Sequence, residues 1–336
     1  MSSTWAEQPL EKALYERLRT LPGTAGDDLY GDYTTARKSV LEDIVEHIDS
    51  AEPNLTDHGP RHLADVMQRA YQLLNLGKND LSPGEFYILC VSILFHDVGN
   101  LHGRTEHQKK IGGIYKHVRG TDARFLGERN AVLAVAGAHT GTTKDGKRDT
   151  LKTLDRQNFQ GASVRIREIA AILRLADELA EGRHRTSAYL SNIGQYSIDS
   201  TIYHAYAQIV DYAIQPGRIA MTFTLDISRV GDKFEVHGVA LSELLKLCYK
   251  RIIKLDQERR FCKYYCPFLH ELAETGAWFN FYFEGYSLEL DLHPLVISDL
   301  VVPGDVTNEV ASVDADYDLT TLVPRLTALC SGGRLQ

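Results

Sequence analysis

Apolar residues recur at intervals of three and four positions through roughly the first half of the chain. This spacing is typical of helices that bury one face. It predicts helices at residues 8–20, 36–49, 60–76, 83–95, 105–118, 128–138 and 163–181. Two polar, glycine-containing stretches interrupt the pattern, at residues 23–28 and 141–161, and both are predicted to be exposed loops.

The pattern changes after residue 195. The segments RIAMTFTLDI (218–227) and WFNFYFEGYSLELDL (278–292) are rich in aromatic and β-favouring residues and partly alternate, which predicts strands. Between them, residues 239–265 have the spacing of a long amphipathic helix. The sequence therefore predicts a mainly α protein, with a helical bundle followed by a C-terminal α+β module. The aromatic run in the second segment is either a buried strand or part of an interface.

Composition places the chain among globular proteins with a real core, since 43% of its 336 residues are hydrophobic and 24% are charged. The net charge of −8 argues against a surface that coats nucleic acid, although it leaves room for a basic pocket. No apolar run reaches the roughly 20 residues of a membrane span, and the N-terminus does not resemble a secretory signal. Five cysteines form no disulfide framework, so we expect reduced thiols and a cytoplasmic protein.

The stretch ILCVSILFHDVGN, residues 88–100, raises a chemical question. Its apolar run ends in His96 and Asp97, and burying either group without a partner costs several kcal/mol. The other candidate partners embedded in the helical pattern are His58, His62, His107, His139 and Asp177. Imidazole and carboxylate together suit divalent ions such as Mn, Fe, Co, Ni or Zn. Two such ions bridged by one carboxylate can activate water and neutralise a phosphoryl oxygen.

The order His62, His96-Asp97, Asp177 resembles the HD superfamily of metal-dependent phosphohydrolases, which is named after its His-Asp pair. HDVGN is similar to the family's His-Asp followed by an apolar residue and glycine, and LRLADEL around Asp177 is similar to its closing aspartate motif. The resemblance extends over residues 55–182. Within this superfamily, the sequence most resembles HD domains found beside bacterial chaperone-like ATPases.

The resemblance implies that His62, His96, Asp97 and Asp177 bind a first ion, and that Asp97 bridges to a second ion held by His107 and His139. HGPRHLADV resembles the motif of cyclic-nucleotide phosphodiesterases, where a histidine four residues before the ligand protonates the leaving oxygen. His58 would then be a general acid. A lysine after HDVGN, and a second histidine and a glutamate after position 139, would mark cyclic-di-GMP-degrading relatives. They are missing, so that substrate is not expected.

The expected organisation has four parts: an N-terminal helical segment that packs on the core (1–50), the HD domain (51–190), the α+β module (195–305) and a tail without a clear pattern (306–336).

Cationic residues near the ligands are candidates for binding phosphate, arginine as a fork and lysine as a point charge. The candidates are Arg61, Arg104, Lys109, Lys110, Arg174, His184 and Arg185. Lys109 is favoured as a catalytic residue, because on a helix it would lie beside His107 near the mouth of the site. Taken singly, each of these charges is more often a solvated surface group.

Two further motifs receive structural interpretations. CKYYCPFLH (262–270) lacks the spacing of a zinc knuckle and is interpreted as helix packing. The basic residues of 250–263 would suit a nucleotide or a nucleic-acid strand. A solvated helix face with i,i+4 ion pairs is the preferred interpretation.

The sequence thus predicts a metal-dependent phosphohydrolase or phosphodiesterase, a phosphoric ester hydrolase acting on a nucleotide or nucleotide phosphodiester. The expected cofactors are two divalent ions from among Mn, Fe, Co, Ni, Mg and Zn. The expected partner is a small molecule rather than nucleic acid or a membrane, and a homo-oligomer is compatible with the sequence. Two alternatives stay open: a di-iron HD-type oxygenase with the same ligands, and a non-catalytic nucleotide sensor or scaffold.

Overall fold

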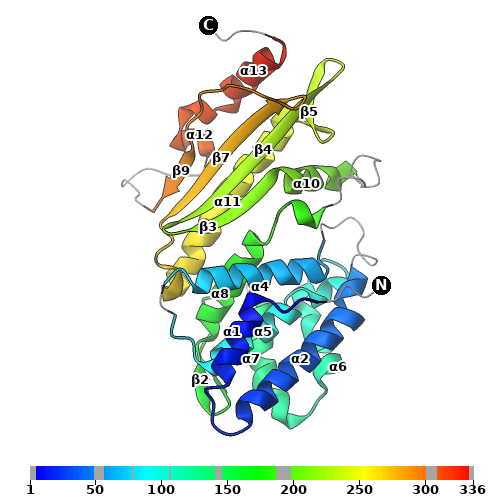
Figure 1. The fold of residues 1–336 in the computed structure, drawn as a ribbon, viewed down its shortest axis with the longest axis vertical. Helices are drawn as coiled ribbons and strands as arrows, with labels where there is room; N and C mark the ends of the chain where they lie inside the picture. Colours follow the sequence, from blue (N-terminus) through cyan, green and yellow to red (C-terminus); the bar gives the residue numbers. More distant parts are fainter. Residues whose placement is uncertain are drawn as a thin grey trace. The chain divides into compact units, whose positions relative to one another are not determined.

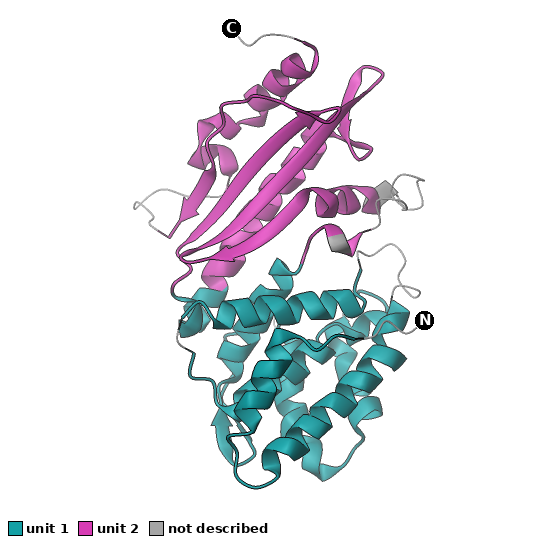
Figure 2. Cartoon of the chain, in the orientation of Figure 1, with its two compact units in different colours: residues 1–180, 262–270 teal, residues 181–261, 271–336 magenta. Residues whose placement is uncertain are grey.

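The computed structural model describes residues 5–48, 57–77, 79–105, 107–140, 146–186, 198–299 and 309–332. The chain divides into two compact units (Figure 2): unit 1 comprises residues 1–180 and 262–270, and unit 2 comprises residues 181–261 and 271–336. The prediction of a mainly α protein with a C-terminal α+β module is confirmed. The four-part division of the chain stays a prediction. None of the described helices combines the length and apolarity that crossing a bilayer requires.

Unit 1 is a helical bundle built around α5. Its helices are α1 (Pro9–Leu18), α2 (Ala25–Asp43), α4 (Pro60–Leu74), α5 (Pro83–Phe95), α6 (Ile111–Arg119), α7 (Leu126–Gly137) and α8 (Ile166–Leu179). Short 3₁₀ turns, η1 (Val45–His47), η2 (Val98–His102), η3 (His107–Lys109) and η4 (Ala123–Phe125), and a hairpin of β1 (Gln157–Phe159) and β2 (Ala162–Val164) join them. α5 packs against α1, α2, α7 and α8, and its residues from Glu85 to Phe95 are all buried.

The first turn of α5 is held by a capping box. Ser82 Oγ accepts a hydrogen bond from the amide of Glu85, and the Glu85 carboxylate accepts one from the amide of Ser82. Arg165 donates to the same carboxylate from Nε at 2.7 Å and from Nη2 at 2.8 Å. Because the start of α5 is fixed in this way, its other end, at His96, is fixed too.

The N-terminal helix pair differs from the prediction. The helix expected at 36–49 already begins at Ala25, so the predicted loop at 23–28 is largely its first turn. A Cβ on Gly26 would collide with the backbone carbonyl of Leu18 at the end of α1. Gly26 therefore permits a close approach of two helices, and Asp27 and Asp28 favour a helix N-terminus electrostatically.

Two other predictions in unit 1 were partly wrong. The helix expected at 105–118 is split into η3 and α6. The β1–β2 hairpin, residues 157–164, begins in the stretch expected to be an exposed loop (141–161) and continues to the start of the helix expected at 163–181, and Leu151 is fully buried. Phe159 of this hairpin stacks on Tyr87 of α5, with ring centroids 5.5 Å apart. The apolar residues in this polar stretch thus anchor it to the bundle.

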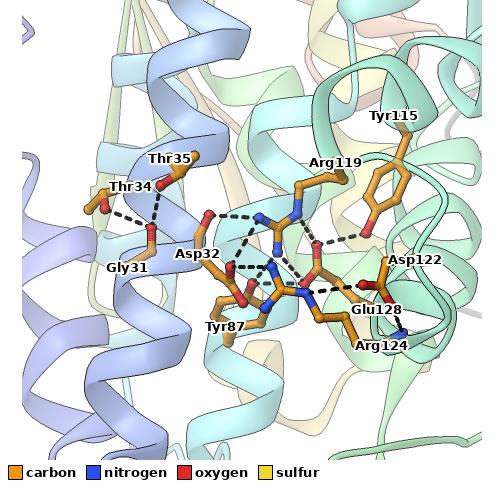
Figure 3. A network of polar contacts seen from close by, with 10 residues as sticks. All are labelled: Gly31, Asp32, Thr34, Thr35, Tyr87, Tyr115, Arg119, Asp122, Arg124 and Glu128. Atoms are coloured by element: carbon orange, nitrogen blue, oxygen red, sulfur yellow. Dashed lines mark hydrogen bonds and ion pairs between the residues drawn. The ribbon is translucent and has the colours of Figure 1, made fainter.

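A buried ionic network connects α2, α5, α6 and α7 (Figure 3). Glu128 accepts hydrogen bonds from Arg119 Nε at 2.9 Å and Nη2 at 2.8 Å. It also accepts from the hydroxyls of Tyr87 at 2.8 Å and Tyr115 at 2.7 Å. Arg119 Nη1 donates to the backbone carbonyl of Asp32 at 2.9 Å. The side chains of Arg119 and Glu128 are each 3% exposed, so protein groups replace the water that both charges lose.

Unit 2 is built on a mixed sheet (Figure 1). Its strands are β3 (Val210–Gln215), β4 (Arg218–Val230), β5 (Lys233–Val236), β6 (Val239–Ala240), β7 (Glu274–Phe283), β8 (Tyr286–Ser287) and β9 (Leu295–Ser298). β4 pairs antiparallel with β3 and β5 and parallel with β7. The connection between the parallel strands contains α11 (Leu241–Tyr265), whose Tyr249 packs on Phe279 of β7 with ring centroids 6.1 Å apart.

The remaining elements are η5 (Arg183–Arg185), α10 (Ile198–Ile209), η6 (Pro267–Leu269, in unit 1), α12 (Val310–Val313), η7 (Ala315–Tyr317) and α13 (Leu319–Cys330). The tail without a predicted pattern thus contains helices. The strand predicted at 278–292 was partly wrong: β7 begins earlier, at Glu274, a turn at residues 284–285 separates it from β8, and residues 288–292 form no strand. β7 pairs with β4 along residues 274–283, so the aromatic residues from Trp278 to Phe283 belong to a strand of the sheet, whereas β9 pairs only with residues 274–277.

The basic helix face is only partly solvated. Arg259 is fully buried and bonds to Asp256 at 2.7 Å and to Asp299 at 2.8 Å, which the sequence interpretation did not anticipate. Arg260 forms the expected kind of i,i+4 pair with Asp256, at 2.7 Å. Cys262 and Cys266 are both fully buried.

We expect Glu128→Gln to destabilise the protein by about 3 kcal/mol, because the buried Arg119 would lose its closest counter-charge and keep only Asp32, whose Oδ1 lies 3.7 Å from Nη1. Equilibrium unfolding in denaturant measures this loss. Asp122→Asn is the matched control: Asp122 belongs to the same drawn network (Figure 3), but its side chain is 64% exposed. Its expected effect is within about 0.5 kcal/mol. Equal losses in the two variants would contradict a stabilising role for the buried pair.

Candidate metal centre

The six residues expected to bind metal converge in unit 1. His62 lies on α4, His96 caps α5, Asp97 precedes η2, His107 begins η3, His139 follows α7, and Asp177 lies on α8. Ligand atoms of His62, His96, Asp97 and Asp177 all lie within 4.8 Å of one another, and so do those of Asp97, His107 and His139. Asp97 belongs to both groups.

The two oxygens of Asp97 face different histidines. Oδ2 lies 3.5 Å from His62 Nε2 and 3.4 Å from His96 Nε2. Oδ1 lies 3.3 Å from His107 Nε2 and 3.5 Å from His139 Nε2. Atoms bound to one ion at about 2.0–2.1 Å lie roughly 2.8–3.0 Å apart at adjacent octahedral positions and roughly 3.3–3.4 Å apart in tetrahedral geometry. The observed separations are close to that range.

Asp177 completes the first group. Its Oδ1 lies 3.2 Å from His62 Nε2 and 3.6 Å from His96 Nε2. Two carboxylates and two imidazoles therefore surround one point at the junction of α4, α5 and α8.

Three of the histidines are oriented by the same local device. Nδ1 of His96, His107 and His139 contacts the backbone carbonyl three residues earlier, at 2.8, 3.1 and 2.5 Å respectively. A carbonyl can only accept, so Nδ1 carries a proton, and in the neutral form of each ring the Nε2 lone pair is directed into the cluster. For His96 and His139 the carbonyl belongs to the last turn of a helix, where the carbonyls lack intrahelical partners.

Several buried nitrogens in the cluster have no hydrogen-bond partner among the described residues. They are His62 Nδ1, His62 Nε2 and His96 Nε2. In addition, His107 Nε2 and His139 Nε2 lie 3.3 Å apart, and in the tautomers set by their Nδ1 contacts both are acceptors. Facing lone pairs repel each other unless a proton or a metal ion lies between them. The donor set therefore fits a divalent cation.

The electrostatics of the cluster favour a positive charge within it. Burial would lower the pKa of His96, but Asp97 and Asp177 raise it to about 9. Burial would likewise raise the pKa of Asp97, yet the surrounding histidines, led by His96, hold it well below its usual range. Contacts with His62 and His96 overcome burial in the same way and keep the pKa of Asp177 well below normal. Both carboxylates are thus anionic at neutral pH.

Gly99 brings η3 onto η2. A Cβ at this position would collide with the backbone carbonyl of His107. The glycine of HDVGN therefore permits the close backbone approach that carries the His107 ring to Asp97.

His58 lies at the edge of the cluster. Its Nε2 is 3.9 Å from Asp97 Oδ2, its ring centroid is 5.5 Å from that of His62, and its side chain is 11% exposed. His58 is therefore close to the clustered side chains and still reaches solvent.

The candidate phosphate-binding residues are distributed over both units. Arg61, Arg104, Lys109 and Lys110 are exposed on or next to the unit 1 elements that carry the ligands. In unit 2, Arg185 is buried, and the side chain of His184 lies outside the described part of the chain. Arg174 is half-buried and donates from Nη1 to Thr150 Oγ1 at 3.1 Å, so its guanidinium is used within the bundle.

Sequence reasoning missed one residue near the six clustered side chains. Thr150 is 7% exposed, and its hydroxyl donates to the backbone carbonyl of Ala138, the residue before His139, at 2.7 Å. The signal that could have identified it is the apolar Leu151 beside it in an otherwise polar stretch.

A family model described as HD-CE matches residues 52–252, which is more than half of the chain. The chain belongs to the HD-CE family. This is an HD-type family, so the resemblance inferred from the His-Asp pair is confirmed. The HD-CE match includes His58 and all six clustered residues. No curated protein matches the chain.

We expect Gly99→Ala to weaken Co²⁺ binding by the Asp97, His107 and His139 group by roughly tenfold or more, because the added methyl displaces η3. Absorption of bound Co²⁺ during a titration measures this. Gly113→Ala on α6 is the matched control, since an added Cβ there meets nothing within 4 Å. An unchanged titration for Gly99→Ala would show that the η2–η3 contact does not position His107.

Proposed function

We propose that this HD-CE protein is a metal-dependent phosphohydrolase or phosphodiesterase that acts on a nucleotide or a nucleotide phosphodiester. The observation that carries the proposal is the division of Asp97 between two groups of histidines, with one carboxylate oxygen toward each. A carboxylate in this arrangement suits a bridge between two ions.

The ligands of the first ion would be His62, His96, Asp97 and Asp177, and those of the second would be Asp97, His107 and His139. Mixed imidazole and carboxylate sets favour Mn, Fe, Co, Ni or Zn over Mg, which prefers oxygen. When bound, such ions supply Lewis acidity toward a phosphoryl oxygen and lower the pKa of water.

The protein's own groups would supply the proton and bind the charged substrate. His58 is within reach of the centre, and its partial exposure allows it to take a proton from solvent and give it to the leaving oxygen. Lys109 shares η3 with His107, which supports a role in binding the phosphoryl group. Arg61, Arg104 and Lys110, and His184 and Arg185 after Asp177, remain candidate contacts to the substrate.

Elemental analysis of protein purified without chelator tests the metal centre. We expect about two transition-metal ions per chain, and a large loss of both in Asp97→Asn, because that residue is shared by the two groups. Asp155→Asn, whose side chain is 93% exposed, is the matched control and should keep both ions. Failure to bind metal even after reconstitution would overturn the proposal.

The same preparation tests the reaction. The metal-loaded protein should hydrolyse a phosphodiester such as bis-p-nitrophenyl phosphate or a cyclic nucleotide, and chelation should abolish turnover. Iron-dependent oxygen consumption without ester hydrolysis would instead identify the oxygenase. Tight nucleotide binding without turnover would identify the sensor or scaffold, and either result would overturn the hydrolase assignment.

We expect His58→Gln to lower kcat by about 10²- to 10⁴-fold while metal content stays unchanged, since a proton donor is not a ligand. The loss should shrink for substrates whose leaving groups need no protonation, such as p-nitrophenolate. Loss of metal from this variant would assign His58 to the ligand set, and full activity would exclude it as the acid.

A further inference from the structure

We propose that Thr150 and Arg174 are positioning residues for His139, and that they set the affinity of the second ion's site. The inference rests on the proposed function and names a part of the centre that lies outside the ligand motifs.

Three groups meet at the end of α7. Thr150 Oγ1 donates to the backbone carbonyl of Ala138 at 2.7 Å and accepts from Arg174 Nη1 at 3.1 Å. The same Nη1 lies 3.5 Å from the Ala138 carbonyl, at the limit of a hydrogen bond. The Thr150 hydroxyl thus works as donor and acceptor at once, in a buried place where an unmade bond is costly.

The Ala138 carbonyl matters because it belongs to the peptide plane that leads into His139. A peptide group is planar, so fixing its oxygen also fixes the direction in which the chain enters the next residue. The His139 ring is held separately, by the contact of Nδ1 with the Ala136 carbonyl at 2.5 Å. The ring and the backbone of His139 are therefore held by different hydrogen bonds. Thr150 donates the one that holds the backbone, to the Ala138 carbonyl.

Arg174 connects this end of α7 to the other half of the centre. It lies on α8 three residues before Asp177, so the two side chains share a helix face. α8 therefore carries a proposed ligand of the first ion and, through Arg174 and Thr150, a support for a proposed ligand of the second ion. Through α8, the position of Asp177 is therefore linked to the position of His139, and so is the distance between the two proposed ion sites.

The segment that carries Thr150 is itself anchored within unit 1. Asp149 accepts a hydrogen bond from the hydroxyl of Tyr265 at 2.7 Å. Arg167 donates to the backbone carbonyls of Leu151 at 3.2 Å and Lys152 at 3.0 Å. Bonds on both sides of Thr150 make the segment a rigid support rather than a passive connection.

Thr150→Val keeps the shape of the side chain and removes both hydrogen bonds of the hydroxyl. We expect the dissociation constant of the second Co²⁺ equivalent to rise by roughly tenfold or more, with the first equivalent unchanged. Thr150→Ser should restore wild-type binding, because it restores the hydroxyl. Thr153→Val, at an exposed position of the same segment, is the matched control and should bind both ions normally.

Arg174→Met gives an independent test, since it keeps the aliphatic length and removes the donor. If Arg174 acts through Thr150, the double variant should lose little more second-ion affinity than Thr150→Val alone. Fully additive losses would mean that the two residues act separately, which overturns the relay.

Wild type and His139→Ala are titrated alongside. If wild type binds two ions and His139→Ala binds one, the binuclear centre stands. Unchanged second-ion affinity in Thr150→Val then overturns the positioning role alone, and so does a loss of thermal stability without a change in that affinity. If His139→Ala and wild type bind the same number of ions, the binuclear part of the proposed function fails first.

Discussion

The arrangement of unit 1 follows from one constraint: His96 and Asp97 sit at the end of a helix that cannot leave the core. α5 is buried along its length from Glu85 onward, so the pair at its C-terminus is largely withdrawn from water: His96 is fully buried and Asp97 is 7% exposed. Two charged or polar groups in that position need partners with matching charge and geometry. α4, η3, α8 and the end of α7 each supply one, and the resulting cluster fits a proton or a divalent cation inside it.

The precision of this cluster comes from short-range devices. The capping box at Ser82 and Glu85 determines where α5 begins, and hence where His96 falls. A helix-end carbonyl orients the ring of His96, and another orients His139. Gly99 lets one backbone segment rest on another. Each device uses residues close together in the sequence, although the site they build joins residues more than a hundred positions apart.

Much of this could be predicted from sequence, for a physical reason. Periodicity reports which residues are buried, so α4, α5 and α8 were located within a few residues, and the ligand types stood out against an apolar background. What periodicity does not report is a partner far away in the chain. Gly26 looked like a loop residue because its contact, the carbonyl of Leu18, lies on another helix. Arg259 looked solvated because its partner Asp299 lies 40 residues further on. Thr150 was missed for the same reason, because its hydroxyl contacts the carbonyl of Ala138, 12 residues earlier in the chain.

The two halves of the centre also differ in how they are held. His62 and Asp177 project from regular helices of the bundle, and His96 caps a third, so moving them means moving the core. His107 stands on a short 3₁₀ turn, and His139 follows a helix end that depends on a separate polar segment. Local openings cost least where few buried apolar contacts hold the backbone. The His107 and His139 half is therefore the part of the proposed centre where sequence change would alter metal binding at the smallest cost to the fold.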